Sequence, residues 1–180
     1  MSSFNILLHN RRRKRCQPSS RRADLPALEL WVNNLKYNIL MNPFKYHYPI
    51  DVRFGDLDAF WHVNNARFLV YLEDARSRYL QEMCLLDGKA LWQLPIIVGD
   101  IHIRYRQPIE LGHKVVVSMG ATRISAKTVT FEYQITGEGG TPLHATAESI
   151  MVCYDYETKK TVPLSDELRR KFSEREGREL

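Results

Sequence analysis

The sequence predicts an α+β domain in which one long helix packs on one face of an antiparallel sheet. Three observations predict this class: a strand-like run precedes a strongly apolar helical stripe, four more strand-like runs follow it, and short polar connections separate these later runs. Short connections between consecutive strands favour antiparallel hairpins. A helix segregated to one face of such a sheet is a recurrent layer arrangement.

The first strand is expected at residues 46–54. Apolar side chains alternate there with polar or charged ones, which is the pattern of a half-buried strand. The alternating apolar residues are Tyr46, Tyr48, Ile50, Val52 and Phe54.

A helix is expected from Asn64 or Asn65, both favourable N-cap residues, to about Met83. Its apolar stripe recurs at helical spacing through Phe68, Leu72, Ala75, Tyr79 and Met83. Further apolar residues widen the stripe, so the helix should be covered on several sides; they are Leu69, Val70, Tyr71 and Leu80. Arg76 and Arg78 are expected to face solvent, with glutamates at helical spacing. Gly88 is the expected stop.

Four strands should follow the helix. Their alternating apolar residues span 97–105, 115–121, 129–135 and 145–154. Polar connections at 124–127 and 137–141 suggest hairpins. A final charged helix, introduced by Ser165, is expected to face solvent.

The charge distribution divides the chain. The net charge is +5, but residues 1–40 carry eight Lys and Arg against Asp24 and Glu29, whereas residues 41–180 carry 18 against 19 acidic residues. The globular part is therefore nearly neutral, which argues against nucleic acid as its partner. The expected organisation is a basic N-terminal extension (1–40), a domain (41–165) and a charged C-terminal helix (166–180).

Several interpretations of the extension stay open. It could be a disordered segment, or a segment that precedes a natural start at Met41. It could also be an organellar presequence, because it is rich in Arg and Ser and poor in acids, or a binding patch. Cys16, Cys84 and Cys153 show no paired or metal-ligand spacing, which suits a reducing, cytoplasmic compartment. The sequence contains no run of about 18 or more apolar residues, so no membrane span is predicted.

Residues 51–76 carry the chemistry. Asp56 and Asp58 lie in an extended segment that leads through His62 to Asn64 and Asn65 at the helix start. A helix N-terminus offers free N–H groups and a positive dipole end, which favour developing negative charge. Attack on a carbonyl needs both a base or nucleophile and a cradle for the oxyanion.

The segment GDLDAFWHVNNARFLVYLEDAR resembles the signature of the hotdog-fold acyl-CoA thioesterases, in the 4-hydroxybenzoyl-CoA thioesterase-like family. It is also similar to the Asp…His-Val-Asn-Asn stretch of plant acyl-ACP thioesterases. The resemblance implies a hotdog fold, a curved antiparallel sheet wrapped around a long central helix. It also implies a homodimer or homotetramer with sites at the subunit interface. No metal or redox cofactor is expected, and coenzyme A enters as part of the substrate.

The resemblance also implies residue roles. Asp58 occupies the position of the catalytic carboxylate, as nucleophile or as general base for water. The oxyanion donor would be a backbone amide near Asn65. His62 matches a catalytic-set residue of the plant-type motif, so it could orient water, although a structural role stays open. Asp56 fits a turn or strand-end residue better.

Three residues are assigned to substrate binding: Phe60, Trp61 and Asn64. Plant relatives carry Asn where this chain has Phe60, and many relatives have Gly where it has Trp61. The Trp61 indole is expected to line or plug the acyl pocket. Cationic side chains that could meet coenzyme A phosphates, or serve only structure, are Arg104, Arg106 and Lys114.

The expected activity is therefore hydrolysis of an acyl- or aryl-CoA thioester to free acid and coenzyme A. Two alternatives stay open: an acyl-ACP thioesterase, and a binder of acyl thioesters without turnover. A hotdog dehydratase fits less well, because it needs a differently placed His.

Overall fold

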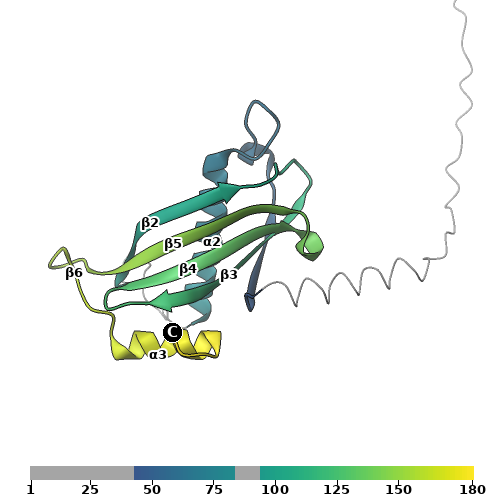
Figure 1. Cartoon of the computed structure of the whole chain (residues 1–180). Helices are drawn as coiled ribbons and strands as arrows, with labels where there is room; N and C mark the ends of the chain where they lie inside the picture. The colour runs from purple at the N-terminus through teal and green to yellow at the C-terminus, as the bar shows by residue number, and fades with distance from the viewer. Residues whose placement is uncertain (1–42, 84–93) are drawn as a thin grey trace, which may run out of the picture.

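The computed structural model describes residues 43–83 and 94–180. Expectations about the basic extension, Cys84 and the helix stop at Gly88 lie outside these residues. Within them, a curved antiparallel sheet lies across one long helix, α2, and a second helix, α3, runs beside the sheet (Figure 1). None of the helices in the described ranges has the length and apolarity to cross a membrane.

The sheet has the strand order β1-β3-β4-β5-β2, with the short β6 paired to β5. Every pairing between these strands is antiparallel. The strands are β1 (Tyr46–Asp51), β2 (Ile96–Tyr105), β3 (Lys114–Ile124), β4 (Thr128–Gly137), β5 (Leu143–Asp155) and β6 (Lys160–Thr161). The two-residue strand β6 was not predicted, because it is too short to show alternation.

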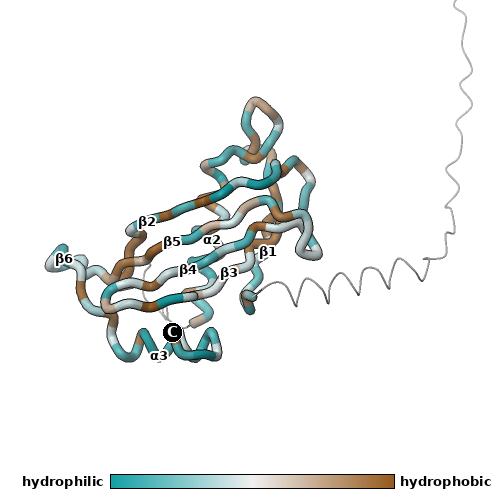
Figure 2. Tube along the Cα trace, viewed as in Figure 1, coloured by the Kyte–Doolittle hydropathy of each residue, from teal (hydrophilic) through white to brown (hydrophobic). Residues whose placement is uncertain are grey.

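Strand boundaries agree with the alternation except at the first strand. The chain leaves β1 at Asp51 and forms a short 3-10 helix, η1 (Phe54–Asp56), so the expected continuation through Phe54 is wrong. Phe54 is 71 % exposed rather than inward-facing. A second 3-10 turn, η3 (Glu138–Gly140), lies in the β4–β5 connection. Apolar and polar residues alternate along the strands (Figure 2).

The central helix α2 (Asn65–Glu82) begins and ends where the sequence predicts. Asn64 is the N-cap, and its side chain accepts a hydrogen bond from Ala66 N at 2.9 Å. All five residues of the predicted stripe are buried. Leu69 and Val70, expected to widen the stripe, stay 39 % and 38 % exposed in the single chain.

Arg76 corrects the sequence expectation. Arg76 is only 7 % exposed, and its guanidinium donates a hydrogen bond to the Tyr133 hydroxyl at 3.4 Å. Tyr133 in turn shares a hydrogen bond of 2.9 Å with Ser149. The prediction of a solvent-facing Arg76 is wrong because the curved sheet covers this side of α2 as well. Arg78, by contrast, bonds to Gln81 on an exposed face.

The C-terminal helix α3 (Asp166–Glu176) begins at the predicted cap, where Ser165 accepts a hydrogen bond from Leu168 N. The expectation that α3 faces solvent is wrong for two residues, since Leu168 is 7 % exposed and Phe172 is fully buried. The Phe172 ring packs edge to face on the Phe131 ring of β4, with 5.8 Å between the ring centroids. The helix therefore completes the core near the C-terminal end of α2.

Candidate active site

A tight loop joins β1 to α2 and carries the motif residues. Its two sides are held by a β-bridge between Leu57 and Val63 and by the hydrogen bond from Asp58 N to His62 O at 2.8 Å. Trp61 N donates to Asp58 O at 3.0 Å, which closes the turn. The backbone of Trp61 takes a left-handed conformation (φ 64°), which residues other than glycine adopt with strain.

Asp58 is held by its own loop. Its Oδ1 accepts a hydrogen bond from Phe60 N at 2.8 Å, an Asx turn. Among the residues that the structure describes, its second carboxylate oxygen has no hydrogen-bond partner. The side chain is thus oriented by one oxygen while the other remains available to a ligand.

Asp56 plays a different part. It is 7 % exposed, and its Oδ2 accepts hydrogen bonds from Arg53 N at 3.0 Å and from the Tyr71 hydroxyl at 2.9 Å. Arg67 lies 3.6 Å from the other oxygen. Burial and the bond to this carboxylate raise the pKa of Tyr71. Asp56 therefore fastens the loop to α2, in agreement with its interpretation as a structural residue.

The start of α2 presents a free amide. Asn64 N donates to Asp56 O at 2.8 Å and Ala66 N is taken by the Asn64 side chain. Between them, Asn65 N has no acceptor within the described part of the chain. A free N–H at the first helical position is a donor for an anionic oxygen.

A cavity of about 320 Å³ opens where the loop, the start of α2 and the end of β2 meet. It brings together all three predicted catalytic residues, Asp58, His62 and Asn65. The remaining lining residues are Val63, Phe68, Tyr105, Arg106, Gln107 and Pro108. One wall is therefore polar and ionisable, while Val63, Phe68 and Pro108 supply apolar surface.

The opposite wall of the cavity is the segment that follows β2. Val63 N donates to Ile109 O at 2.8 Å, and His62 forms a β-bridge with Glu110. Tyr105 donates its hydroxyl to Asn65 O at 3.1 Å, and its ring meets Phe68 edge to face at 5.1 Å. Residues 105–110 were predicted as a strand end, with Arg106 as a candidate for contact with coenzyme A phosphates. Their contact with the motif was not predicted, because nothing local in the sequence shows that this segment folds back onto it.

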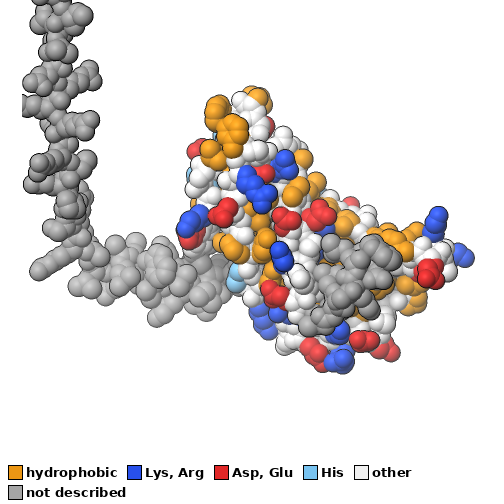
Figure 3. Space-filling view, turned by 180° about the vertical axis from the view of Figure 1, so that it is seen from behind, with side chains coloured by type: hydrophobic (Ala, Val, Ile, Leu, Met, Phe, Trp, Pro, Cys, Tyr) orange, Lys and Arg blue, Asp and Glu red, His pale blue; other side chains and the backbone are white. Residues whose placement is uncertain are grey.

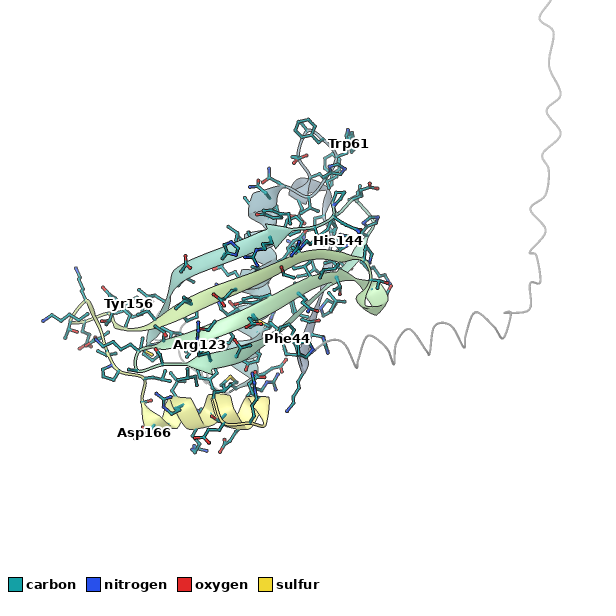
Figure 4. The ribbon with its side chains drawn as sticks, in the orientation of Figure 1. Phe44, Trp61, Arg123, His144, Tyr156 and Asp166 are labelled. Carbon is teal, nitrogen blue, oxygen red and sulfur yellow. The ribbon has the colours of Figure 1, made fainter. Side chains whose placement is uncertain are left out.

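The predicted substrate-binding residues do not line this cavity. Phe60 is 80 % exposed and Trp61 is 67 % exposed. The Trp61 ring packs edge to face on the Phe54 ring, with 6.3 Å between the ring centroids. Asn64 serves as the helix cap. Trp61 lies at the tip of the loop, away from the body of the domain (Figure 4), and hydrophobic side chains gather at this tip (Figure 3).

The cationic candidates lie apart from one another. Arg106 lines the cavity, Lys114 pairs with Glu138 at 3.7 Å, and Arg104 lines a different hollow together with His102. No cluster of three His, Cys, Asp or Glu side chains suited to a metal ion occurs in residues 43–83 and 94–180.

A carboxylate and a helix-start amide without an acceptor among the described residues line one cavity, beside a sheet curved about a central helix. This arrangement suits attack on a thioester carbonyl within a hotdog fold. The chain belongs to the thioesterase-like superfamily, whose family model matches residues 52–172. The hotdog fold expected from the motif is thereby confirmed.

Individual relatives agree with this assignment. The chain is 32 % identical over 125 residues to the long-chain acyl-CoA thioesterase FadM of Escherichia coli, covering 69 % of this chain and 95 % of that protein. It is 26 % identical to the acyl-CoA thioesterase YbgC of Haemophilus influenzae, over 71 % and 93 % of the two chains. A Thermus thermophilus thioesterase solved with coenzyme A and zinc superposes with a TM-score of 0.66 at 30 % sequence identity. The match covers 76 % of this chain and 98 % of that one.

Proposed function

We propose that the protein hydrolyses acyl-CoA thioesters in the cavity beside Asp58. The observation that carries the proposal is the placement of the Asp58 carboxylate and the free Asn65 amide on the same cavity. The names of the relatives support coenzyme A as the carrier. Water is the only co-substrate in this proposal, with no metal or redox cofactor, and the cytoplasm is the proposed compartment.

The reaction follows from this geometry. Asp58 either takes a proton from water, whose oxygen then attacks the thioester carbon, or attacks that carbon itself to give an anhydride that water opens. In both routes the carbonyl electrons move onto oxygen, and Asn65 N–H donates to the resulting oxyanion. Collapse breaks the carbon–sulfur bond and expels the coenzyme A thiolate. The thiolate takes the proton that Asp58 removed from water in the first route, or the proton released when water opens the anhydride in the second. His62, on the same cavity wall, would orient the attacking water.

We also propose that two copies assemble through β2. This ten-residue strand ends the sheet, so one side of its backbone lacks a strand partner among residues 43–83 and 94–180. On this strand Val98 is 43 % exposed and Tyr105 is 46 % exposed. Leu69 and Val70 of α2 are exposed to a similar degree. Pairing of β2 with a second β2 would cover these residues, and two such dimers could form a tetramer.

In such a dimer, Phe60 and Trp61 would contact the acyl group from outside their own cavity. Both rings are exposed in the single chain, and the loop that carries them extends past the β2 edge (Figure 1). Their role in substrate binding thus depends on the assembly. Asn64 would act indirectly, by fixing the start of α2.

Two neighbouring carboxylates provide the test. Asp58→Asn keeps side-chain size but removes the base or nucleophile, so turnover should fall at least ~10²-fold while the melting temperature is unchanged. Asp56→Asn should retain turnover but lower the free energy of unfolding by about 1–3 kcal/mol, because a buried charged acceptor is lost. Release of coenzyme A thiol is measured across butyryl- to palmitoyl-CoA, with acyl-ACP in parallel. Near-normal turnover by Asp58→Asn would refute the proposed site.

A further inference from the structure

One side chain joins the end of β2 to the start of α2, which lie beside each other (Figure 1). The Tyr105 hydroxyl donates a hydrogen bond to Asn65 O at 3.1 Å. Its ring packs edge to face on the Phe68 ring, with 5.1 Å between the ring centroids. All three residues line the cavity that also holds Asp58. Tyr105 therefore contacts the residue that carries the proposed oxyanion donor and a second residue three positions further along α2.

The other hydrogen bonds at the start of α2 come from a different direction. Asn64 N donates to Asp56 O at 2.8 Å, and the Arg67 guanidinium donates to Gly55 O at 3.2 Å. Both bonds tie the helix start to the loop that follows β1. Within the described part of the chain, the Tyr105 hydroxyl makes the only hydrogen bond between β2 and α2. Its loss would leave the first turn held on the β2 side of the cavity by packing alone.

The Asn65 carbonyl does not need this bond to be satisfied. Asn65 is the first residue of α2, and a carbonyl at that position accepts a hydrogen bond from the N–H four residues later. Tyr105 is 46 % exposed, so water can replace Asn65 O as a partner of its hydroxyl. The exchange of one such partner for another contributes little to stability. The bond is therefore better explained by what it does to the position of Asn65.

The position of Asn65 matters because its N–H must meet an oxygen that changes during the reaction. An oxyanion donor acts at about 2.7–3.1 Å from that oxygen, and a misplacement of about 1 Å at a reacting centre can cost ~10²-fold in rate. The N and O atoms belong to the same residue, so a restraint on Asn65 O also restrains Asn65 N. The ring contact with Phe68 adds a second restraint further along the helix, which limits rotation of the first turn.

We propose that Tyr105 is a positioning residue, which fixes the first turn of α2 against β2 so that the Asn65 N–H meets the oxyanion. The inference rests on the proposed function of the Asp58 cavity. An oxyanion develops only as the thioester reacts, so a misplaced donor weakens binding of the transition state more than binding of the substrate. Loss of the Tyr105 hydroxyl therefore lowers kcat and leaves KM nearly unchanged.

Two substitutions separate the hydroxyl from the ring. Tyr105→Phe keeps the ring on Phe68 and should lower kcat for the best acyl-CoA about fivefold, the factor of one ordinary hydrogen bond, with KM within about twofold of wild type. Tyr105→Leu also removes the ring, so kcat should fall further and KM should rise as the cavity loses part of its apolar wall. If Tyr105→Phe keeps the wild-type kcat, or raises KM while kcat is unchanged, the proposal is wrong.

The carbonyl of a bound substrate gives a second measurement, which a general loss of stability would not move. A hydrogen bond to the thioester oxygen lowers the stretching frequency of the carbonyl, and Asp58→Asn should hold the acyl-CoA without hydrolysing it. Isotope-edited infrared spectra then compare Asp58→Asn with the double variant that adds Tyr105→Phe. The carbonyl band of the double variant should lie closer to that of unbound acyl-CoA. Identical bands in the two variants would overturn the proposal.

Tyr156→Phe serves as the matched control. Tyr156 is 45 % exposed and packs edge to face on Tyr154 with 5.2 Å between the ring centroids, but it does not line the cavity. Its substitution should leave kcat, KM and the carbonyl band unchanged, and an effect equal to that of Tyr105→Phe would refute the specific role of Tyr105. Failure of this inference remains distinct from failure of the site. An inactive Asp58→Asn with a wild-type-like Tyr105→Phe overturns only the role of Tyr105.

Discussion

The two ends of α2 differ in how they are completed. At its C-terminal end, Tyr79 is 1 % exposed and lies among aromatic rings, and α3 covers this end with the fully buried Phe172. At its N-terminal end, Asn65 N has no acceptor among the described residues, Phe60 and Trp61 are largely exposed, and a cavity opens beside Asp58.

This difference separates stability from function along one helix. The closed end buries apolar surface and satisfies its polar groups: Glu176 accepts hydrogen bonds from the Tyr79 hydroxyl and from Ala121 N, and Arg175 pairs with Glu82 at 2.7 Å. The open end keeps unused donors and acceptors and a strained Trp61, features that folding alone does not favour. We therefore expect substitutions at the closed end to change stability and those at the open end to change catalysis.

The largest change in stability should come from Phe172→Ala. Removing a fully buried aromatic ring should lower the free energy of unfolding by about 3–5 kcal/mol through lost burial and the remaining cavity. Chemical denaturation measures this loss, and kcat of the folded fraction should be unchanged. Lys171→Ala on the same helix is the control, with an expected change within about 0.5 kcal/mol. A parallel loss of kcat would show that the two ends are coupled.

A smaller loss is expected for Glu176→Ala. The substitution leaves the Tyr79 hydroxyl and Ala121 N without their shared acceptor, which should cost about 1–3 kcal/mol. Tyr79 reports the change directly, because burial and Glu176 together raise its pKa and the variant should lower it. Spectroscopic titration of tyrosines in wild type and variant measures this shift. An unchanged melting temperature would contradict the assignment of Glu176 to the closed end.

The smallest effect on stability should be that of Trp61→Gly. Glycine adopts a positive φ without strain, so the free energy of unfolding should rise by no more than about 1 kcal/mol. If Trp61 contacts the acyl group in the assembled protein, relative kcat/KM for long and short acyl-CoA substrates should change as well. Phe54→Ala, which removes the ring partner without altering φ, separates the two effects. An unchanged chain-length preference would place Trp61 outside the binding site.

Local patterns in the sequence determined most of the fold. The stripe from Phe68 to Met83 and the Asn64 cap predicted α2 with its correct limits, because helix periodicity and capping are properties of neighbouring residues. The alternating runs predicted five strands for the same reason. The motif placed Asp58, His62 and Asn65 together, since they lie within eight residues of one another.

Only the tertiary structure decided the features that need distant segments. Arg76 was expected to face solvent from α2 and Phe172 to belong to a solvent-facing helix. Arg76 is buried because the sheet covers its side of α2, and Phe172 is buried because α3 packs it against Phe131 of β4. The wall from Tyr105 to Pro108 meets the motif through hydrogen bonds between residues about 40 positions apart, and His144 joins it from a third segment. Sequence periodicity records which face of an element is apolar, whereas which segments meet depends on how the whole sheet curves and packs.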